Sequence, residues 1–278
     1  MTGPFDADMI SHLPKSVRFI CHNGAGFDQI DIAACTARGI SVSTTPGAVN
    51  AGTANVAIWL ILSALRTTWI PESELRAGRW RGATPLGRDP DSMTLGILGM
   101  GGIGRATAKR AVAFGFKIQY SNEFTVKDLK EELGVDYEPA RVTTEELLGT
   151  SDVISIHVPL LPSTRGLISD KAISLMKKGA VIVNTARGPI IDEEALVRGL
   201  ESGKLSSVGL DVFENEPKIH PGLLGSSRAI LLPHVGTMTV DTQRKMEVLV
   251  IDNVKSALST GKLLTKVPDV GTPQTSKL

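Results

Sequence analysis

Short apolar runs alternate with helical patterns along most of this chain. Helical patterns extend from Ile103 to Phe114 and from Asp192 to Gly203, among others. Strands that are apolar on both faces and alternate with helices are typical of a parallel sheet covered on both sides. The sequence therefore predicts a doubly wound α/β fold. Runs typical of β-strands begin at Val17, Ile40, Thr94, Lys117, Asp152, Ala180, Ser207 and Ala229.

A glycine-rich turn follows one of these runs. Gly99, Gly101 and Gly104 stand between the run that begins at Thr94 and the helical pattern that begins at Ile103. Such glycines permit a tight turn, close approach of the backbone to a pyrophosphate and close helix packing, while the helix N-terminus stabilises the anion. A merely structural turn is the alternative. The strand before and the helix after the glycines favour a dinucleotide site.

The next strand ends at about the distance where a ribose-binding residue is expected. Asn122 stands there, followed by Glu123. An acidic residue would bind the ribose 2′-hydroxyl of NAD, whereas a nearby arginine would accommodate the 2′-phosphate of NADP. Asn122 removes the repulsive carboxylate, but Glu123 restores a negative charge, and only Lys127 and Lys130 lie near in sequence. These residues leave the choice between NAD and NADP open.

Composition excludes several classes of protein. The chain has 278 residues, and the 42% that are hydrophobic indicate a globular protein. Its formal net charge of +1 provides no basic surplus for binding nucleic acid or an anionic membrane, which favours a small-molecule partner. Cys21 and Cys35 form neither a disulfide framework nor a zinc site, so no metal site is predicted. The run from 54 to 65 is too short for a bilayer and predicts a buried helix. The composition of residues 67–93 is typical of an arm or an interdomain crossing, and that of residues 269–278 is typical of a disordered tail.

Three charged side chains follow successive apolar strands downstream of the glycine turn. Arg187, Glu216 and His234 could converge, because the carboxyl ends of parallel strands line the ligand crevice. Reduction of a carbonyl by a nicotinamide needs a cation for a substrate carboxylate, a proton donor, and a group that keeps the donor charged. A single histidine after a strand is usually only hydrogen-bonded, but this combination favours catalysis. His157 also ends a strand, and we expect it to form a wall near the adenosine rather than an acid.

Several motifs together carry a family resemblance. The segments LGILGMGGIGRATAKRA, HVPLLPSTRGLI, VNTARGPIIDEEALVRGLESG, GLDVFENEP and LPHVGTMT, with NGAGFDQIDIAACTARGISVSTTPGAVNAGTANVAI upstream, resemble the D-isomer-specific 2-hydroxyacid dehydrogenases. Their glyoxylate/hydroxypyruvate reductase branch is the most similar. The resemblance extends from Val17 to about Pro268, with all motifs in order.

The resemblance implies a role for each candidate side chain. Arg187 would bind the substrate carboxylate and polarise the carbonyl, His234 would donate the proton, and Glu216 would pair with His234. The backbone N–H groups of Ala25 and Gly26, in a glycine-rich loop, would hold the substrate carboxylate. The implied cofactor-binding residues are Gly99, Gly101, Gly102, Ile103, Gly104, Asn122, His157, Val158, Pro159, Thr164, Thr185, Ala186, Arg187, Asp211, His234 and Gly236.

The resemblance also implies a domain organisation. Two doubly wound domains would flank a cleft, with residues 1–48 and 237–268 forming the substrate domain and residues 49–236 the dinucleotide-binding domain. The chain begins close to the substrate loop, so we expect a substrate domain abbreviated at its N-terminus. Family members commonly dimerise through the region corresponding to Ala51–Arg88, where Trp69 and Trp80 fit an interface, although they could also pack within their own subunit.

Further expectations concern cofactor and location. In the family that the chain resembles, NADP-using reductases tend to carry a basic residue beside the neutral one, and Asn122-Glu123 departs from this pattern. We expect NADP(H), with NAD(H) as the alternative. The ending Ser276-Lys277-Leu278 predicts recognition by a peroxisomal import receptor, with a cytoplasmic location as the alternative. A dehydrogenase for another D-2-hydroxy acid, a non-enzymatic NAD(P)-sensing binding protein and an inactive truncated product are the competing functional hypotheses.

Overall fold

The computed structural model describes residues 4–268 and divides into two compact units. Of the described residues, one unit comprises 4–52 and 237–268, and the other comprises Thr53–Gly236. The sequence predicted domain boundaries after residues 48 and 236, and the two units divide after Gly52 and Gly236. The predicted tail at 269–278 lies outside the described residues.

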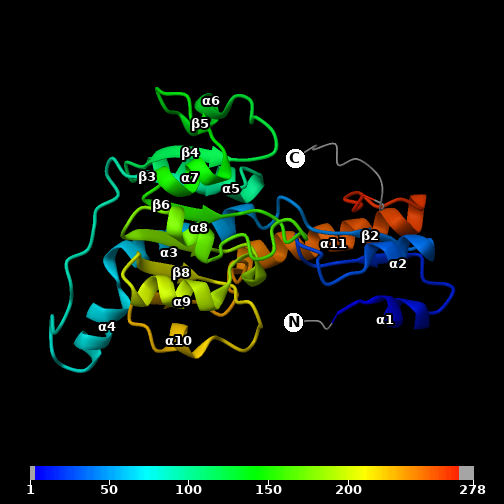
Figure 1. Ribbon diagram of the computed structural model, residues 1–278. Helices are drawn as coiled ribbons and strands as arrows, with labels where there is room; N and C mark the ends of the chain where they lie inside the picture. Colours follow the sequence, from blue (N-terminus) through cyan, green and yellow to red (C-terminus); the bar gives the residue numbers. More distant parts are fainter. Residues whose placement is uncertain (1–3, 269–278) are drawn as a thin grey trace. The chain divides into compact units, whose positions relative to one another are not determined.

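The larger unit is built on a seven-stranded parallel sheet (Figure 1). The strand order is β5-β4-β3-β6-β7-β8-β9. Strands β3 to β5 follow one another toward one edge and β6 to β9 toward the other, as in a doubly wound sheet. The predicted strand runs in this part of the sequence are confirmed. The strands are β3 (Thr94–Leu98), β4 (Lys117–Ser121), β5 (Ala140–Arg141), β6 (Val153–Ile156), β7 (Ala180–Asn184), β8 (Leu205–Leu210) and β9 (Ala229–Leu231).

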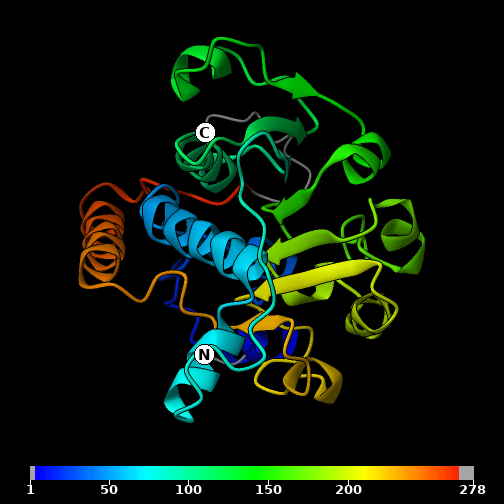
Figure 2. The same ribbon diagram turned by 90° about the vertical axis from the view of Figure 1, so that its left-hand side faces the viewer.

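Both faces of the sheet are covered, because successive strand residues enter two different cores. Val153 and Val181 belong to one apolar cluster, whereas Ile154 and Ile182 belong to the other. The first cluster includes residues of α3 (Asn50–Arg66), α5 (Gly102–Val112) and α6 (Leu129–Leu133). The second includes residues of α7 (Thr144–Thr150), α8 (Asp170–Leu175) and α9 (Glu193–Glu201), so helices flank the sheet on both sides (Figure 2). Successive side chains of a strand point to opposite faces of the sheet. Because these strands are apolar at every position, both faces are buried under helices.

The helices of this unit begin at side chains that satisfy their first N–H groups. Asp192 accepts from the Ala195 N–H (3.0 Å) at the start of α9, and Thr143 accepts from the Glu146 N–H (3.1 Å) at the start of α7. The helices are α3 (Asn50–Arg66), α4 (Trp69–Arg76), α5 (Gly102–Val112), α6 (Leu129–Leu133), α7 (Thr144–Thr150), α8 (Asp170–Leu175), the short 3₁₀ helix Gly188–Ile190, α9 (Glu193–Glu201) and α10 (Pro221–Leu224).

The smaller unit contains α1 (Ala7–His12), β1 (Phe19–Cys21), α2 (Ile32–Ala37), β2 (Ser41–Ser43) and α11 (Val240–Thr260). In its described residues β1 and β2 form a two-stranded parallel sheet, and Ile10, Cys35 and Val42 are among the residues of its core. The second doubly wound sheet implied by the resemblance is thus represented here by two strands.

The segment after α3 is only partly the irregular arm that the sequence suggests. Residues 69–76 form α4, while the chain from 80 to 90 has turns and no regular helix or strand. Among the described residues no single helix is long and apolar enough to cross a membrane; α3 and α4 meet that test only as a pair bent by 73°. In α3, Leu60 and Ile61 are fully buried in the core of the larger unit, in agreement with the predicted buried helix.

Candidate active site

Strand order brings the three predicted charged residues to one end of the sheet. Arg187 follows β7, Glu216 follows β8 and His234 follows β9, and these three strands are immediate neighbours. Parallel strands end at the same edge of a sheet, so the three loops emerge side by side. This adjacency is a property of the sheet order, which the sequence alone does not reveal.

The loop that carries Arg187 is held by a buried asparagine. Asn184, fully buried at the end of β7, donates to the Arg187 carbonyl (2.8 Å) and accepts from the Ala186 N–H (2.9 Å). The Arg187 guanidinium donates to the Ala186 carbonyl (2.8 Å). Asn184 was not identified from the sequence, although a polar residue that ends an all-apolar strand is a usable signal. Its two bonds restrict the turn from which Arg187 extends.

The loop after β8 packs directly against this turn. A Cβ atom on Gly188 would lie 1.8 Å from the Phe213 carbonyl carbon, so only glycine permits this approach. The carboxylate of Glu193, which is only 6% exposed, accepts from the Glu214 N–H (2.8 Å). Glu193 therefore fixes the loop that leads to Glu216, and it is a second residue that sequence reasoning missed.

Glu216 and His234 form a hydrogen-bonded pair. Glu216 Oε2 lies 3.0 Å from His234 Nδ1, and Glu216 Oε1 accepts from the Phe213 N–H at 3.0 Å. The carboxylate side chain is 16% exposed, whereas the imidazole is 45% exposed. His234 Nε2 has no hydrogen bond within the described part of the chain, which leaves this nitrogen for a ligand. The arrangement can hold a protonated imidazole in one orientation.

Charge and hydrogen bonding keep Glu216 ionised. Burial by itself raises the pKa of Glu216, but hydrogen bonds from His234 and from the Phe213 N–H oppose this effect. The nearby charges of His234 and Arg187 act in the same direction, and the pKa of Glu216 ends below its ordinary value. The partner of the imidazole is therefore an anion under neutral conditions.

Asp211 fixes the backbone on which His234 stands. Its carboxylate, 1% exposed, accepts from the N–H groups of Val235 (2.7 Å) and Gly236 (2.8 Å). His234 itself has a φ of +56°, which is unfavourable for a residue with a Cβ atom and persists only where its surroundings enforce it. Burial of Asp211 is the main reason that its pKa is raised, although the two backbone N–H groups act against this. We infer that Asp211 positions the histidine loop.

The glycine turn after β3 has the geometry of an anion site. Gly99 has a φ of +97°, and a Cβ atom there would lie 2.8 Å from the backbone of His157 and Val158. A Cβ atom on Gly104 would lie 2.2 Å from the Gly99 carbonyl oxygen. A Cβ atom on Gly101 would meet no described heavy atom within 4 Å, so protein packing does not require glycine there. Space for a ligand explains Gly101, and a dinucleotide pyrophosphate fits the turn.

Other predicted cofactor residues lie on loops that follow β4, β6 and β7. Asn122 follows β4, and Thr164 closes the loop after β6 by donating to the Pro159 carbonyl (2.7 Å). His157 Nε2 lies 2.8 Å from Ser155 Oγ, and burial lowers the pKa of His157 to about 3, as suits a neutral wall. His157 Nδ1 and Thr185 Oγ1 are among the buried polar atoms that have no hydrogen bond within residues 4–268. Both atoms are available to a bound cofactor.

The predicted substrate loop belongs to the smaller unit. Its backbone is held by Thr45, whose N–H donates to the Gly24 carbonyl (2.9 Å), and His22 Nε2 lies 3.0 Å from the Gly26 carbonyl oxygen. The N–H groups of Ala25 and Gly26 donate to no acceptor among residues 4–268. The loop can therefore offer both N–H groups to an anion. In the same described range, no group of three or more His, Cys, Asp or Glu side chains could hold a metal ion.

Known proteins agree with this architecture. Residues 58–236 match the model of the D-isomer specific 2-hydroxyacid dehydrogenase NAD binding domain. The chain belongs to the D-isomer specific 2-hydroxyacid dehydrogenases. It is therefore an NAD(P)-dependent oxidoreductase of 2-oxo and 2-hydroxy acids. The expected family and fold are confirmed.

The similar proteins include several that are named as reductases. 4-Methyl-2-oxopentanoate reductase A of Aspergillus oryzae is 55% identical over 96% of this chain and 80% of its own length. The crystal structure of a glyoxylate reductase from Paecilomyes thermophila is 56% identical, with a TM-score of 0.91 over 96% of this chain and 80% of that chain. An NADPH-dependent glyoxylate/hydroxypyruvate reductase of Sinorhizobium meliloti, in complex with NADP and malonate, is 36% identical with a TM-score of 0.87 over 96% and 82%.

Proposed function

We propose that the chain reduces glyoxylate or hydroxypyruvate to the corresponding 2-hydroxy acid with NAD(P)H. The observation that carries this proposal is the hydrogen-bonded pair of Glu216 and His234 on strand ends adjacent to Arg187. Glyoxylate reductases are among the similar proteins, which supports the choice of substrate. The A. oryzae relative is named for 4-methyl-2-oxopentanoate, so this larger 2-oxo acid is the competing substrate.

The described side chains can perform each step that the protein must supply. The nicotinamide, when bound, provides the hydride. Arg187 would bind the carboxylate of the 2-oxo acid with its guanidinium and withdraw charge from the carbonyl oxygen. His234 would give its Nε2 proton to that oxygen, while Glu216 keeps the imidazole oriented and its charge compensated. Asp211 would act through the backbone of the histidine loop.

The test follows oxidation of NADPH and NADH with glyoxylate, hydroxypyruvate and 4-methyl-2-oxopentanoate. Replacement of His234 by Ala should reduce kcat by about 100-fold or more and leave cofactor affinity nearly unchanged, because general acid catalysis contributes about 10²–10⁴-fold. His220→Ala is a matched control, since His220 is also paired with a glutamate, Glu194, at 2.9 Å. Unchanged turnover in His234→Ala would refute the assignment.

The chain is further proposed to prefer NADP(H). Asn122, directly after β4, places no carboxylate at the ribose position, and the S. meliloti relative was solved with NADP. Dissociation constants of NADPH and NADH, measured by calorimetry, test the preference. Equal or tighter binding of NADH would refute it.

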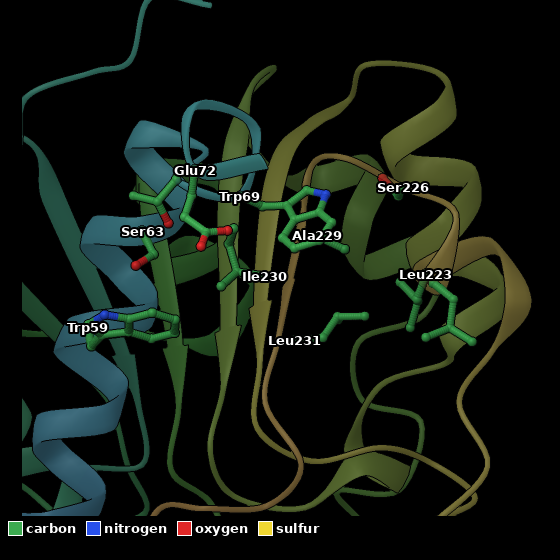
Figure 3. Close-up of a pocket in the computed structure, with 11 residues that line it drawn as sticks. Trp59, Ser63, Trp69, Glu72, Leu223, Ser226, Ala229, Ile230 and Leu231 are labelled. Atoms are coloured by element: carbon green, nitrogen blue, oxygen red, sulfur yellow. The ribbon is translucent and has the colours of Figure 1, made fainter. Parts of the chain in front are cut away.

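A homodimer formed through residues 51–88 is proposed as well. All three tryptophans are exposed: Trp59 by 48%, Trp69 by 55% and Trp80 by 73%. Trp59 and Trp69 line an apolar hollow of about 600 Å³ with Leu223 and Leu231 (Figure 3). Exposed aromatic residues around such a hollow are typical of an interface. Light scattering should give twice the chain mass, and Trp69→Asp should reduce it while Phe114→Ser, outside this region, should not. A monomeric wild type would refute the dimer.

Import into peroxisomes is proposed from the residues Ser276-Lys277-Leu278, which lie outside the described range. A fluorescent protein that ends in residues 269–278 should collect in peroxisomes, and the same fusion with Leu278→Asp should remain dispersed. A dispersed pattern for both fusions would refute the proposal.

A further inference from the structure

An arginine distant in sequence lies beside the ribose position. Arg141 is the last residue of β5, which pairs with β4 in the register Tyr120↔Arg141. Its Nε donates to the Asn122 carbonyl (3.1 Å), and its Nη2 donates to the Glu123 carbonyl (2.8 Å). We propose that Arg141 is the cation that recognises the adenosine 2′-phosphate of NADP. This inference rests on the proposed NADP(H) preference and assigns the residue that produces it.

The position of the guanidinium is defined by the main chain. Two carbonyl acceptors, on consecutive residues, orient the Arg141 fork against the loop where a ribose-binding residue is expected. These bonds use two of the five N–H donors of arginine, and Arg141 has no further hydrogen bond or ion pair within the described residues. The remaining donors can bind an anion, and the side chain is exposed to solvent. A guanidinium fork of this kind matches the geometry of phosphate oxygens.

The local charges favour a cation at this position. Glu123 would repel a 2′-phosphate. Within residues 4–268, the two lysines near it in sequence, Lys127 and Lys130, make no hydrogen bond or ion pair with Asn122 or Glu123. Arg141 binds the carbonyl of Glu123 itself, so its charge lies at the backbone of the acidic residue. It therefore offsets the negative charge at the point where the phosphate would be placed. Because Arg141 follows Asn122 by 19 residues, sequence proximity does not reveal it.

The test compares dinucleotides and fragments with and without the 2′-phosphate. Calorimetry would measure binding of NADPH, NADH, 2′,5′-ADP and 5′-AMP to the wild type and to Arg141→Gln. We expect Arg141→Gln to weaken NADPH and 2′,5′-ADP by about 10- to 100-fold, as loss of charge-assisted hydrogen bonds does, and to change NADH and 5′-AMP by less than about twofold. Arg141→Lys should retain part of the affinity for the 2′-phosphate.

Matched controls separate recognition from support of the loop. Lys127→Gln and Lys130→Gln remove a charge from the same region and should change the NADPH-to-NADH ratio little. Equal weakening of NADH and NADPH by Arg141→Gln would show that Arg141 only supports the loop, and no weakening would exclude it from the site. A large effect of either lysine variant instead would also overturn the assignment. Failure of the wild type to bind either dinucleotide would refute the proposed function itself, whatever the behaviour of the variants.

Discussion

Substitution of Gly101 or Gly104 by alanine should separate cofactor binding from folding. The two glycines stand three residues apart in the same turn, but the structure gives them different neighbours. A Cβ atom on Gly104 would lie 2.2 Å from the Gly99 carbonyl oxygen, about 1.2 Å closer than an ordinary contact. Gly99 cannot yield easily, because it packs on the backbone of His157 and has a φ of +97°.

The magnitudes differ accordingly. Overpacking of this kind costs about 1–3 kcal/mol, and the upper end is expected for Gly104→Ala because the opposing atom belongs to the backbone. A loss of about 3 kcal/mol lowers Tm by roughly 6–12 °C in a unit of this size. Gly101 has a φ of −80°, which alanine also adopts, so Gly101→Ala should change the free energy of unfolding by less than about 1 kcal/mol. Its methyl group would instead enter the space assigned to the pyrophosphate and weaken binding by about 10- to 100-fold.

Thermal unfolding followed by circular dichroism and NADPH binding measured by calorimetry give the two readouts. Gly149→Ala in α7 is a control, since its Cβ atom would meet only the Leu175 carbonyl oxygen at 3.7 Å. Gly101→Ala with wild-type affinity would refute the placement of the pyrophosphate. A wild-type Tm in Gly104→Ala would refute the packing argument.

Three further predictions concern buried charged or titratable groups. Asp211→Asn should lower the free energy of unfolding by about 1–3 kcal/mol, because the amide can accept from only one of the two N–H groups. The same variant should reduce kcat more than NADPH affinity. Stability and kinetics equal to those of the wild type would contradict this prediction. Glu193→Ala should reduce kcat at least about tenfold, because the loop that leads to Glu216 loses its acceptor for the Glu214 N–H. Glu193→Gln should retain most of the wild-type kcat, since the amide oxygen can still accept from this N–H. Equal kinetics in both variants would exclude the positioning role. Burial lowers the pKa of His157 to about 3, so the unfolded chain protonates this side chain before the folded chain does as the pH falls below about 6.5. The stability that neutral His157 contributes should then be lost at about 1.4 kcal/mol per pH unit. Urea unfolding of His157→Asn should show a flatter pH dependence of the free energy of unfolding, and a slope identical to that of the wild type would refute this prediction.

Much of the fold could be predicted from local patterns. Strand runs such as that at Ala180 are apolar at every position, and the sheet buries both of their faces. Helix α9 begins and ends where Asp192 and Gly203 indicate, since capping is decided by groups within one turn. The arm was predicted less well, because α4 contains no buried residue. Periodicity records burial, so it is informative only where an element is buried.

The composition of the site also followed from the sequence. A glycine turn between a strand and a helix, and the charged residues Arg187, Glu216 and His234 after later strands, are all visible in the printed chain. The local spacing of residue types thus determined the chemistry available to this protein.

The tertiary structure decided which of these groups meet. The adjacency of β7, β8 and β9, the bonds from Asp211 to the histidine loop, and the contact of Arg141 with Asn122 all join residues 18 or more positions apart. The physical reason is that a side chain's own neighbours along the chain determine its periodicity and capping, whereas strand order is determined by how whole strands and helices pack around a common core. Hydrogen bonds between separate loops exist only after that order is established.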